Sequence, residues 1–182
     1  MNPTDLRSHV FLLGPHGCGK GTLGRALAAY GYEHISVGAL GRLARKRQFV
    51  SDVPMKLQLL MLRHVPGTPL AGQVVEHLVQ HVRSCSRVVV DGFPGSIEHL
   101  PALGDLEQWS FVYVYAPKTE RETRLTERAR RTSRTWTAGG HSERDLALPA
   151  LWRYLRARTT LHVFNNTPTR LEHESVLMPL AA

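Results

Sequence analysis

The sequence is poor in cysteine and in aromatic residues, and it has no long apolar run. Its two cysteines, Cys18 and Cys85, are too few and too far apart for a disulfide-stapled domain, so we expect reduced thiols and a cytoplasmic location. No apolar stretch approaches the roughly 20 residues of a membrane span, and the apolar run near the N-terminus is too short for a signal peptide. We therefore expect no membrane partner.

Acidic residues are scarce relative to basic ones. There are 23 lysines and arginines against 15 aspartates and glutamates, which gives a formal net charge of +8. Such a charge indicates anionic partners, either nucleic acid or small phosphate compounds in a focused cleft. The aromatic residues, 7% of the chain, do not alternate with arginine along a strand as a stacking RNA-binding sheet requires. We expect small phosphate compounds as partners and no nucleic acid.

Strand and helix patterns alternate regularly along the chain. With 182 residues, 42% of them hydrophobic, the chain fits one globular domain with a substantial core. Strand patterns fall at 9–13, 34–36, 87–91, 109–116 and 161–164, and helix patterns at 20–30, 39–48, 53–64, 72–83, 118–130, 145–158 and 169–178. This alternation predicts an α/β fold, a five-stranded parallel sheet with helices on both faces. Residues 130–142 lack both periodicities and are predicted to form a mobile surface loop.

The stretch GPHGCGKGT, residues 14–22, follows the first predicted strand and opens the first predicted helix. Strand, glycine-rich loop, lysine and helix in this order are typical of a phosphate-binding P-loop. Glycines let backbone N–H groups turn toward phosphate oxygens, and the positive end of the helix dipole completes the anion site. Lys20 adds a charge for the outer phosphates. Gly21 stands where the general pattern has Ser or Thr, and Thr22 comes next.

Two motifs together resemble the adenylate kinase and nucleoside monophosphate kinase family. GPHGCGKGT is similar to that family's P-loop, which also has Gly-Thr after the lysine. VVVDGFP at 88–94 is similar to the family's DGFP signature, which follows an apolar strand. The pair is more specific than either motif alone.

Weaker similarities follow in the family's order and extend the resemblance over about residues 10–175. HISVGALGR at 34–42 and GTPLAGQVV at 67–75 resemble the stretches that open and close the acceptor-binding domain. RLTER at 124–128, with Arg134, resembles the arginines that flank the lid. Asn166-Thr-Pro168 lies where the family's adenine-contacting loop follows its last strand.

The resemblance implies a P-loop kinase that moves the γ-phosphate of ATP to a nucleoside monophosphate or a closely related small acceptor, with Mg²⁺. One domain is expected over 1–182. It has a core at 8–36, 68–129 and 145–182, a helical acceptor-binding insertion at 37–67 and a short lid at 130–144. We expect a monomer whose lid closes on ATP and excludes water.

The site residues follow from that match, position by position. The catalytic set is Lys20, Asp91, Arg128 and Arg134. The ATP-binding set is Gly17, Cys18, Gly19, Lys20, Gly21, Thr22, Arg124, Asn166 and Pro168. The acceptor-binding set is Ser36, Val37, Arg42, Gly92, Phe93, Gly95 and His99. Thr22 would ligate Mg²⁺, and Asp91 would hold it through water.

The acceptor side departs from the family pattern at four positions. Val37 replaces a threonine, Ala39 an aspartate, Gly95 an arginine, and His99 a base-reading glutamine. Loss of a bidentate arginine–phosphate contact is worth about 2–3 kcal/mol, or roughly two decades in affinity. The expected acceptor is therefore not plain AMP. Compensating cations are available in two groups, Arg45, Lys46 and Arg47 in one and Arg144, Arg153 and Arg156 in the other.

Two alternatives to a monophosphate acceptor remain open from the sequence. A phosphate-free acceptor such as a nucleoside is favoured by the missing arginine at Gly95. A non-catalytic protein that binds ATP and RNA is favoured by the net positive charge alone.

Overall fold

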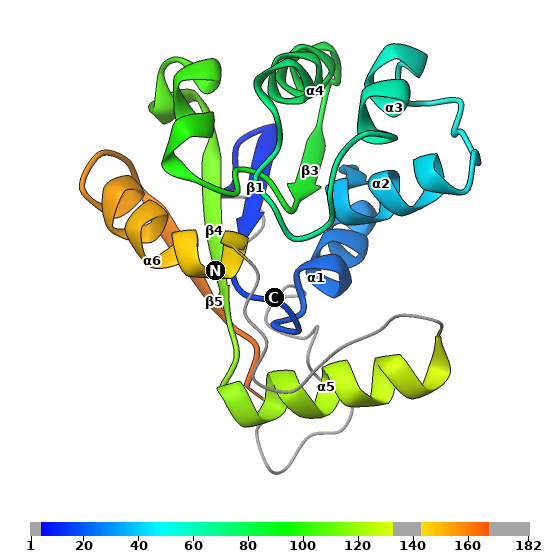
Figure 1. The fold of residues 1–182 in the computed structure, drawn as a ribbon. Coiled ribbons are helices and arrows are strands. Elements are labelled where there is room, and N and C mark those ends of the chain that lie inside the picture. Colours follow the sequence, from blue (N-terminus) through cyan, green and yellow to red (C-terminus); the bar gives the residue numbers. More distant parts are fainter. Residues whose placement is uncertain (1–4, 133–142, 168–182) are drawn as a thin grey trace.

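Five strands pair in parallel to form one sheet in the computed structural model, which describes residues 5–132 and 143–167 (Figure 1). The strands are β1 (His9–Leu13), β2 (Glu33–Ser36), β3 (Val88–Asp91), β4 (Ser110–Tyr115) and β5 (Leu161–Asn165). Their order across the sheet is β2-β3-β1-β4-β5. The central strands are mostly apolar, as in the VVV run of β3, because helices cover both faces of a parallel sheet.

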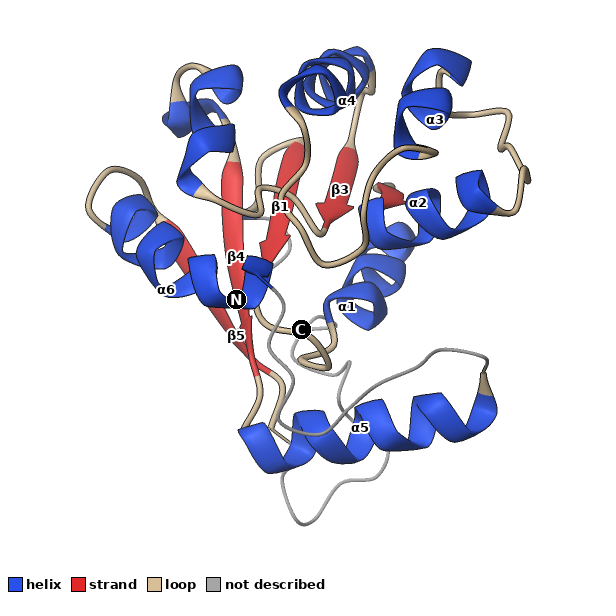
Figure 2. Cartoon of the chain, viewed as in Figure 1, coloured by secondary structure: helices blue, strands red, loops and turns tan. Residues whose placement is uncertain are grey.

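The helices connect these strands and surround the sheet (Figure 2). They are α1 (Lys20–Leu27), α2 (Val37–Arg45), α3 (Met55–Met61), α4 (Gly72–Ser84), α5 (Lys118–Arg131) and α6 (Glu143–Arg156). Short 3₁₀ helices follow at η2 (Ala28–Tyr30), η3 (Ile97–Leu103) and η4 (Leu106–Gln108). The sequence pattern missed η3 and η4, because 3₁₀ segments lack the 3.6-residue period and η3 contains Pro101. The predicted helix at 169–178 and most of the predicted mobile loop lie outside the described residues.

The core is divided by the sheet into two clusters. On one face α1 packs Leu23 and Leu27 against strand residues such as Leu12. On the other face α4 packs Leu78 and Val82 with the aromatic and aliphatic side chains of β1 and β3, among them Phe11. Adjacent strand residues contribute to opposite clusters because side chains alternate across a strand. These helices confirm the predicted α/β class.

The strand order brings the ends of β1, β2 and β3 together. β1 is followed by a crossover to β2 on one side, whereas β3 is followed by β4 on the other side of β1. The sheet therefore changes winding direction at β1, and ligands of open α/β sheets bind at such a point. In register, Asp91 at the end of β3 lies between Leu12 of β1 and Ser36 of β2.

Gly24 marks the closest approach of α1 to β2. A Cβ built at this buried position would come within 2.9 Å of Cε1 of His34 and closer still to its Nε2. The missing side chain thus leaves room for the His34 imidazole between α1 and Asp91, to which His34 donates a hydrogen bond of 2.8 Å.

We expect Gly24→Ala to lower the free energy of unfolding by up to about 2 kcal/mol, measured by urea denaturation. Overpacking costs about 1–3 kcal/mol, and the roughly 1 kcal/mol that alanine gains over glycine in a helix offsets part of that cost. Gly72→Ala is the matched control, because a Cβ there meets nothing within 4 Å. A Gly24→Ala variant as stable as Gly72→Ala would show that His34 has room to move.

Candidate active site

The glycine-rich loop between β1 and α1 depends on backbone conformations that favour glycine. Gly14, Gly17 and Gly19 have φ angles of 135°, 80° and 102°. A Cβ at Gly17 would lie 2.7 Å from the carbonyl oxygen of Arg121, and one at Gly19 would overlap the side-chain amide of Asn166. The loop is therefore enclosed by α5 and by the segment after β5. A side chain at Gly17 or Gly19 would displace one of these two segments.

Lys20 begins α1 and folds back over the loop. Its Nζ donates hydrogen bonds to the carbonyl oxygens of Gly14 at 2.6 Å and Pro15 at 2.8 Å. Burial lowers the pKa of the Lys20 ammonium, and the charge of Arg144 lowers it further, while Cys18 and Asp91 oppose the shift. The ammonium group is thus held at the loop, in a desolvated place where an anion would interact strongly with it.

Asp91 accepts hydrogen bonds on both carboxylate oxygens. His34 Nε2 donates to Oδ2 at 2.8 Å, and Ser36 Oγ donates to Oδ1 at 3.2 Å. Burial raises the pKa of Asp91, but the hydrogen bond and charge of His34, with the charge of Lys20, outweigh it and leave the pKa lowered. Asp91 is therefore an ionised carboxylate beside the P-loop.

Arg124 and Asn166 close the loop from the other side. Arg124 Nη2 donates to the carbonyl oxygen of Asn166 at 3.0 Å, and Asn166 Nδ2 donates to that of Cys18 at 2.8 Å. The other terminal nitrogen of Arg124, Nη1, is buried without a hydrogen-bond partner among the described residues. A buried donor left unpaired is costly unless a ligand completes it, so Arg124 fits an anion bound next to Gly19.

A cleft of about 730 Å³ joins these groups to the α2 side of the molecule. It is lined by cationic side chains, which are Lys20, Arg25, Arg42, Arg124, Arg128 and Arg144. Asp91 is the one carboxylate among the described residues that line it. Low-dielectric walls with one dominant sign of charge concentrate the opposite sign, so the cleft suits a strongly anionic ligand.

Arg144, on the first turn of α6, lies beside Gly95. A Cβ built at Gly95 would be 3.4 Å from Cδ and 3.5 Å from Nε of Arg144, and one at Gly92 would be 3.4 Å from its Nη1. The side chain of Arg144 therefore packs against Gly95, at the position where a Cβ of residue 95 would lie. Burial lowers the pKa of Arg144, and Asp145 and Asp91 oppose that shift.

The other candidate cations do not line the cleft. Arg153 lines a different cavity, and the guanidinium of Arg156 lies 5.1 Å from the centre of the Trp152 ring. Arg45, Lys46 and Arg47 lie exposed at the end of α2 and do not line the cleft. Of the arginines that the sequence left open, Arg144 is the one that the structure brings to the cleft.

A contact between the P-loop and α6 was missed by the sequence analysis. His16 Nδ1 lies 2.8 Å from Asp145 Oδ2, so the residue next to Arg144 is tied to the loop. Burial raises the pKa of Asp145, but the hydrogen bond and charge of His16 outweigh it and leave the pKa lowered. The sequence offered one indication of this contact, a histidine inside the glycine-rich stretch. Its carboxylate partner is 129 residues away, so the pairing depends on the fold.

The predicted residues divide between the cleft surface and the wall behind it. Those that line the cleft are Gly17, Gly19, Lys20, Gly21, Thr22, Ser36, Arg42, Asp91, Arg124 and Arg128. Those that do not line it are Cys18, Val37, Gly92, Phe93, Gly95, His99 and Asn166. Arg134 and Pro168 lie outside the described residues.

His99 is buried and has both ring nitrogens engaged. Nδ1 accepts a hydrogen bond from the backbone N–H of Gly95 at 3.0 Å, so Nε2 carries the proton and donates to the carbonyl oxygen of Leu70 at 3.2 Å. Its ring stacks on Phe93 with 5.4 Å between centroids. The structure therefore does not bring His99 into the cleft as a ligand-reading side chain.

A divalent cation would find few protein ligands here. The described residues contain no cluster of three or more His, Cys, Asp or Glu side chains able to hold a metal. Thr22 and Asp91 line the same cleft, and Mg²⁺ characteristically takes one or two such oxygen groups together with substrate phosphates and waters. The donor set fits Mg²⁺ that arrives with a nucleotide and does not fit a resident structural metal.

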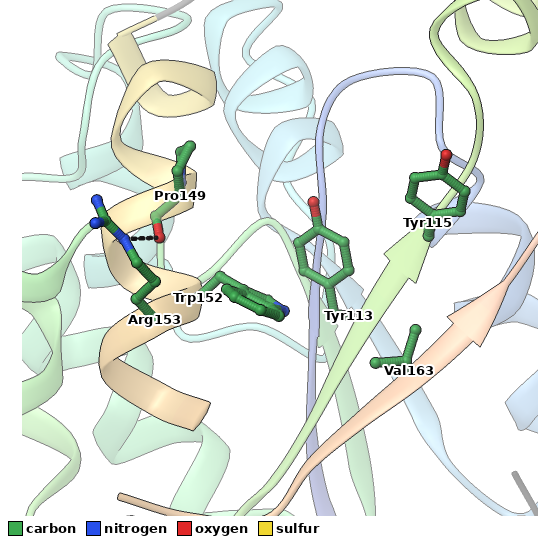
Figure 3. Close-up of a pocket in the computed structure, with 6 residues that line it drawn as sticks. All are labelled: Tyr113, Tyr115, Pro149, Trp152, Arg153 and Val163. Carbon is green, nitrogen blue, oxygen red and sulfur yellow. Dashed lines mark hydrogen bonds between the residues drawn. The ribbon is translucent and has the colours of Figure 1, made fainter. Parts of the chain in front are cut away.

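A second cavity, of about 470 Å³, lies between α6 and strands β4 and β5 (Figure 3). It is lined by Tyr113, Tyr115, Pro149, Trp152, Arg153 and Val163. Arg153 Nε donates to the carbonyl oxygen of Pro149 at 3.3 Å, which holds that side chain along its own helix. Of the residues considered for the site, the candidate cation Arg153 lines this cavity and lies apart from the others.

Comparison with known proteins gives one family match and several relatives. The family model described as an AAA domain matches residues 10–147. An adenylate kinase of Encephalitozoon cuniculi is 31% identical over 100 residues, which are 54% of each chain. An adenylate kinase of Mycobacterium sp. is 36% identical over 98 residues, 53% of this chain and 54% of the relative. The match thus spans about half the length of these relatives. Among the described residues, no helix is long and apolar enough to cross a membrane.

The lowered pKa of Asp91 predicts an acid-dependent contribution to stability. The unfolded chain protonates this group near its ordinary value of 3.8, whereas the folded chain keeps it ionised to lower pH. Its stabilising effect is therefore present above about pH 4 and is lost as the pH falls through the folded-state pKa.

We expect Asp91→Asn to destabilise the protein by about 2 kcal/mol at pH 7, because a charge-assisted hydrogen bond is lost. In urea denaturation between pH 7 and pH 3, the difference in free energy of unfolding between the variant and the wild type should decrease below pH 4. Exposed Asp52→Asn controls for the removal of one negative charge. A difference that stays constant down to pH 3 would contradict the assignment.

Proposed function

The chain belongs to the adenylate kinase-like family of P-loop proteins, and from that premise we propose that it transfers the γ-phosphate of ATP to a nucleoside monophosphate or a closely related small acceptor. The observation that carries the proposal is one cationic cleft with Lys20 and Arg124 at the P-loop and Arg144 with Arg42 toward the insertion. Two anionic ligands in one cleft are what phosphoryl transfer between nucleotides requires.

ATP would bind on the P-loop side. The amides of the Gly17–Thr22 turn would hold its phosphates at the N-terminus of α1, and Lys20 would move from the loop carbonyls to the outer phosphates. Arg124 would use its unpaired Nη1 on a phosphate oxygen. Asn166 and Pro168 would contribute to the adenine loop after β5.

Mg²⁺ would be held by Thr22 and, through water, by Asp91. Both oxygens of Asp91 already accept a hydrogen bond from His34 or Ser36, which favours contact through water. The ion would neutralise charge on the β- and γ-phosphates.

The acceptor phosphate would lie between Arg42 and Arg144. Arg144 packs against Gly95 and lines the cleft, so the missing residue does not leave this side without a cation. This argues for an acceptor that carries a phosphate, and against the phosphate-free nucleoside. We propose further that AMP is not the dedicated acceptor, because Val37 is apolar and His99 is held away from the cleft.

The reaction is a displacement at phosphorus. An oxygen of the acceptor phosphate attacks the γ-phosphorus, the bond from γ-phosphorus to the bridging oxygen breaks, and ADP leaves with the acceptor now a diphosphate. Lys20, Arg128 and Arg144 would stabilise the charge on the transferring group from different sides. The insertion at 37–67 and the lid at 130–144, with Arg134, would close over both ligands and exclude water.

We expect Lys20→Ala to reduce kcat by about a thousandfold or more, because the transferring phosphate loses its positioning charge. The assay detects product from ATP with each common monophosphate. Lys56→Ala, an exposed lysine of α3, is the control and should keep wild-type rates. Near-normal turnover in a folded Lys20→Ala protein would refute the P-loop assignment.

We expect Arg144→Met to raise KM for the acceptor about tenfold to a hundredfold and to leave KM for ATP within about twofold, since one charged phosphate contact is lost. Arg153→Met, on the same helix but outside the cleft, is the matched control. Equal changes in both KM values would contradict the assignment of Arg144 to the acceptor side.

A further inference from the structure

The insertion side of the cleft presents an apolar surface. Apart from Ser36 and Arg42, the side chains that line it from α2 and the following loop are Ala39, Leu40, Leu43, Val50 and Val53. A nucleoside monophosphate held at its phosphate by Arg42 and Arg144 would place its base against this apolar wall.

Gln58 of α3 uses its side-chain amide to hydrogen-bond the main chain of two residues of that wall, Val50 and Val53. Its Oε1 accepts from the backbone N–H of Val50 at 2.9 Å. Its Nε2 donates to the carbonyl oxygens of Val50 at 2.7 Å and Val53 at 2.6 Å. Buried Gln58 thus uses both of its amide hydrogens on main-chain carbonyl oxygens, and its own oxygen pairs the N–H of Val50.

Two further polar side chains on this side, those of Ser36 and His99, also hydrogen-bond to the protein. Ser36 Oγ donates its one hydrogen to Asp91 and accepts from the backbone N–H of Ala39 at the start of α2. His99 bonds the backbone of Gly95 and Leu70 through its two nitrogens. Among the described residues that line this side, the charged side chains are the cations Arg42 and Arg144, which suit a phosphate.

We propose that the acceptor site recognises the phosphate and holds the base by apolar contact alone, so that it takes nucleoside monophosphates as a class, purine and pyrimidine alike. The inference rests on the proposed function. A site built to hydrogen-bond its substrate rejects analogues by about 10⁴- to 10⁵-fold, whereas an apolar pocket discriminates by only about 10- to 200-fold.

The experiment measures kcat/KM for AMP, GMP, CMP and UMP with saturating ATP, and turnover of the matching nucleosides. The expected result is turnover of all four monophosphates within about 100-fold of one another, with none of the nucleosides phosphorylated. A preference of more than about 10³-fold for one base overturns the inference and leaves the kinase proposal standing. Absence of transfer to every monophosphate overturns the proposed function itself.

A matched pair of variants tests the wall directly. Leu43→Gln places an amide on the partly exposed cleft surface, whereas Leu59→Gln places the same amide on the exposed face of α3. Leu43→Gln should change the ratio of kcat/KM between at least two bases by about three- to tenfold, and Leu59→Gln should leave the ratios unchanged. Equal effects of Leu43→Gln on all four substrates would show that this wall does not contact the base.

Discussion

The buried carboxylate of Asp91 is the interaction on which the cleft depends. It is the one negative charge among the described residues of a cleft lined by a lysine and five arginines. It is also the point where three elements meet, since β3 carries it, β2 supplies His34 and Ser36, and α1 leaves room for His34 at Gly24. Without a counter-charge, closely spaced cations repel one another in a low-dielectric site, and the cleft would have to open or lose protons.

The acceptor side shows that a charge can be supplied from a different part of the chain. Gly95 has no side chain, and Arg144 from α6 lies over it. Arg144 is in turn placed by its helix, whose first turn bonds the carbonyl oxygen of Gly67 and, through Asp145, the P-loop residue His16. Phosphate binding requires a guanidinium group at the right place in space, and residues from different parts of the chain can supply that group.

The polar groups on the acceptor side differ in their hydrogen bonding from those around the P-loop. Around the P-loop, the buried Nη1 of Arg124 has no hydrogen-bond partner among the described residues, which leaves it available to a ligand. On the acceptor side, Gln58 of the insertion and Ser36 at the end of β2 use their hydrogens on the protein itself. This difference is the physical basis for proposing strict recognition of phosphate groups together with weak recognition of the base.

The sequence by itself determined the fold class and the phosphate loop. Strand and helix periods are local, and the positive-φ glycines around Lys20 are a local requirement of the loop, so both are readable without contacts. The strand order, the 3₁₀ helices and the pairing of His34 with Asp91 were decided by tertiary structure. So were the burial of His99, the placement of Arg144 over Gly95 and the His16–Asp145 contact, because each joins segments whose distance in space is set by how helices pack on the sheet and by no pattern along the chain.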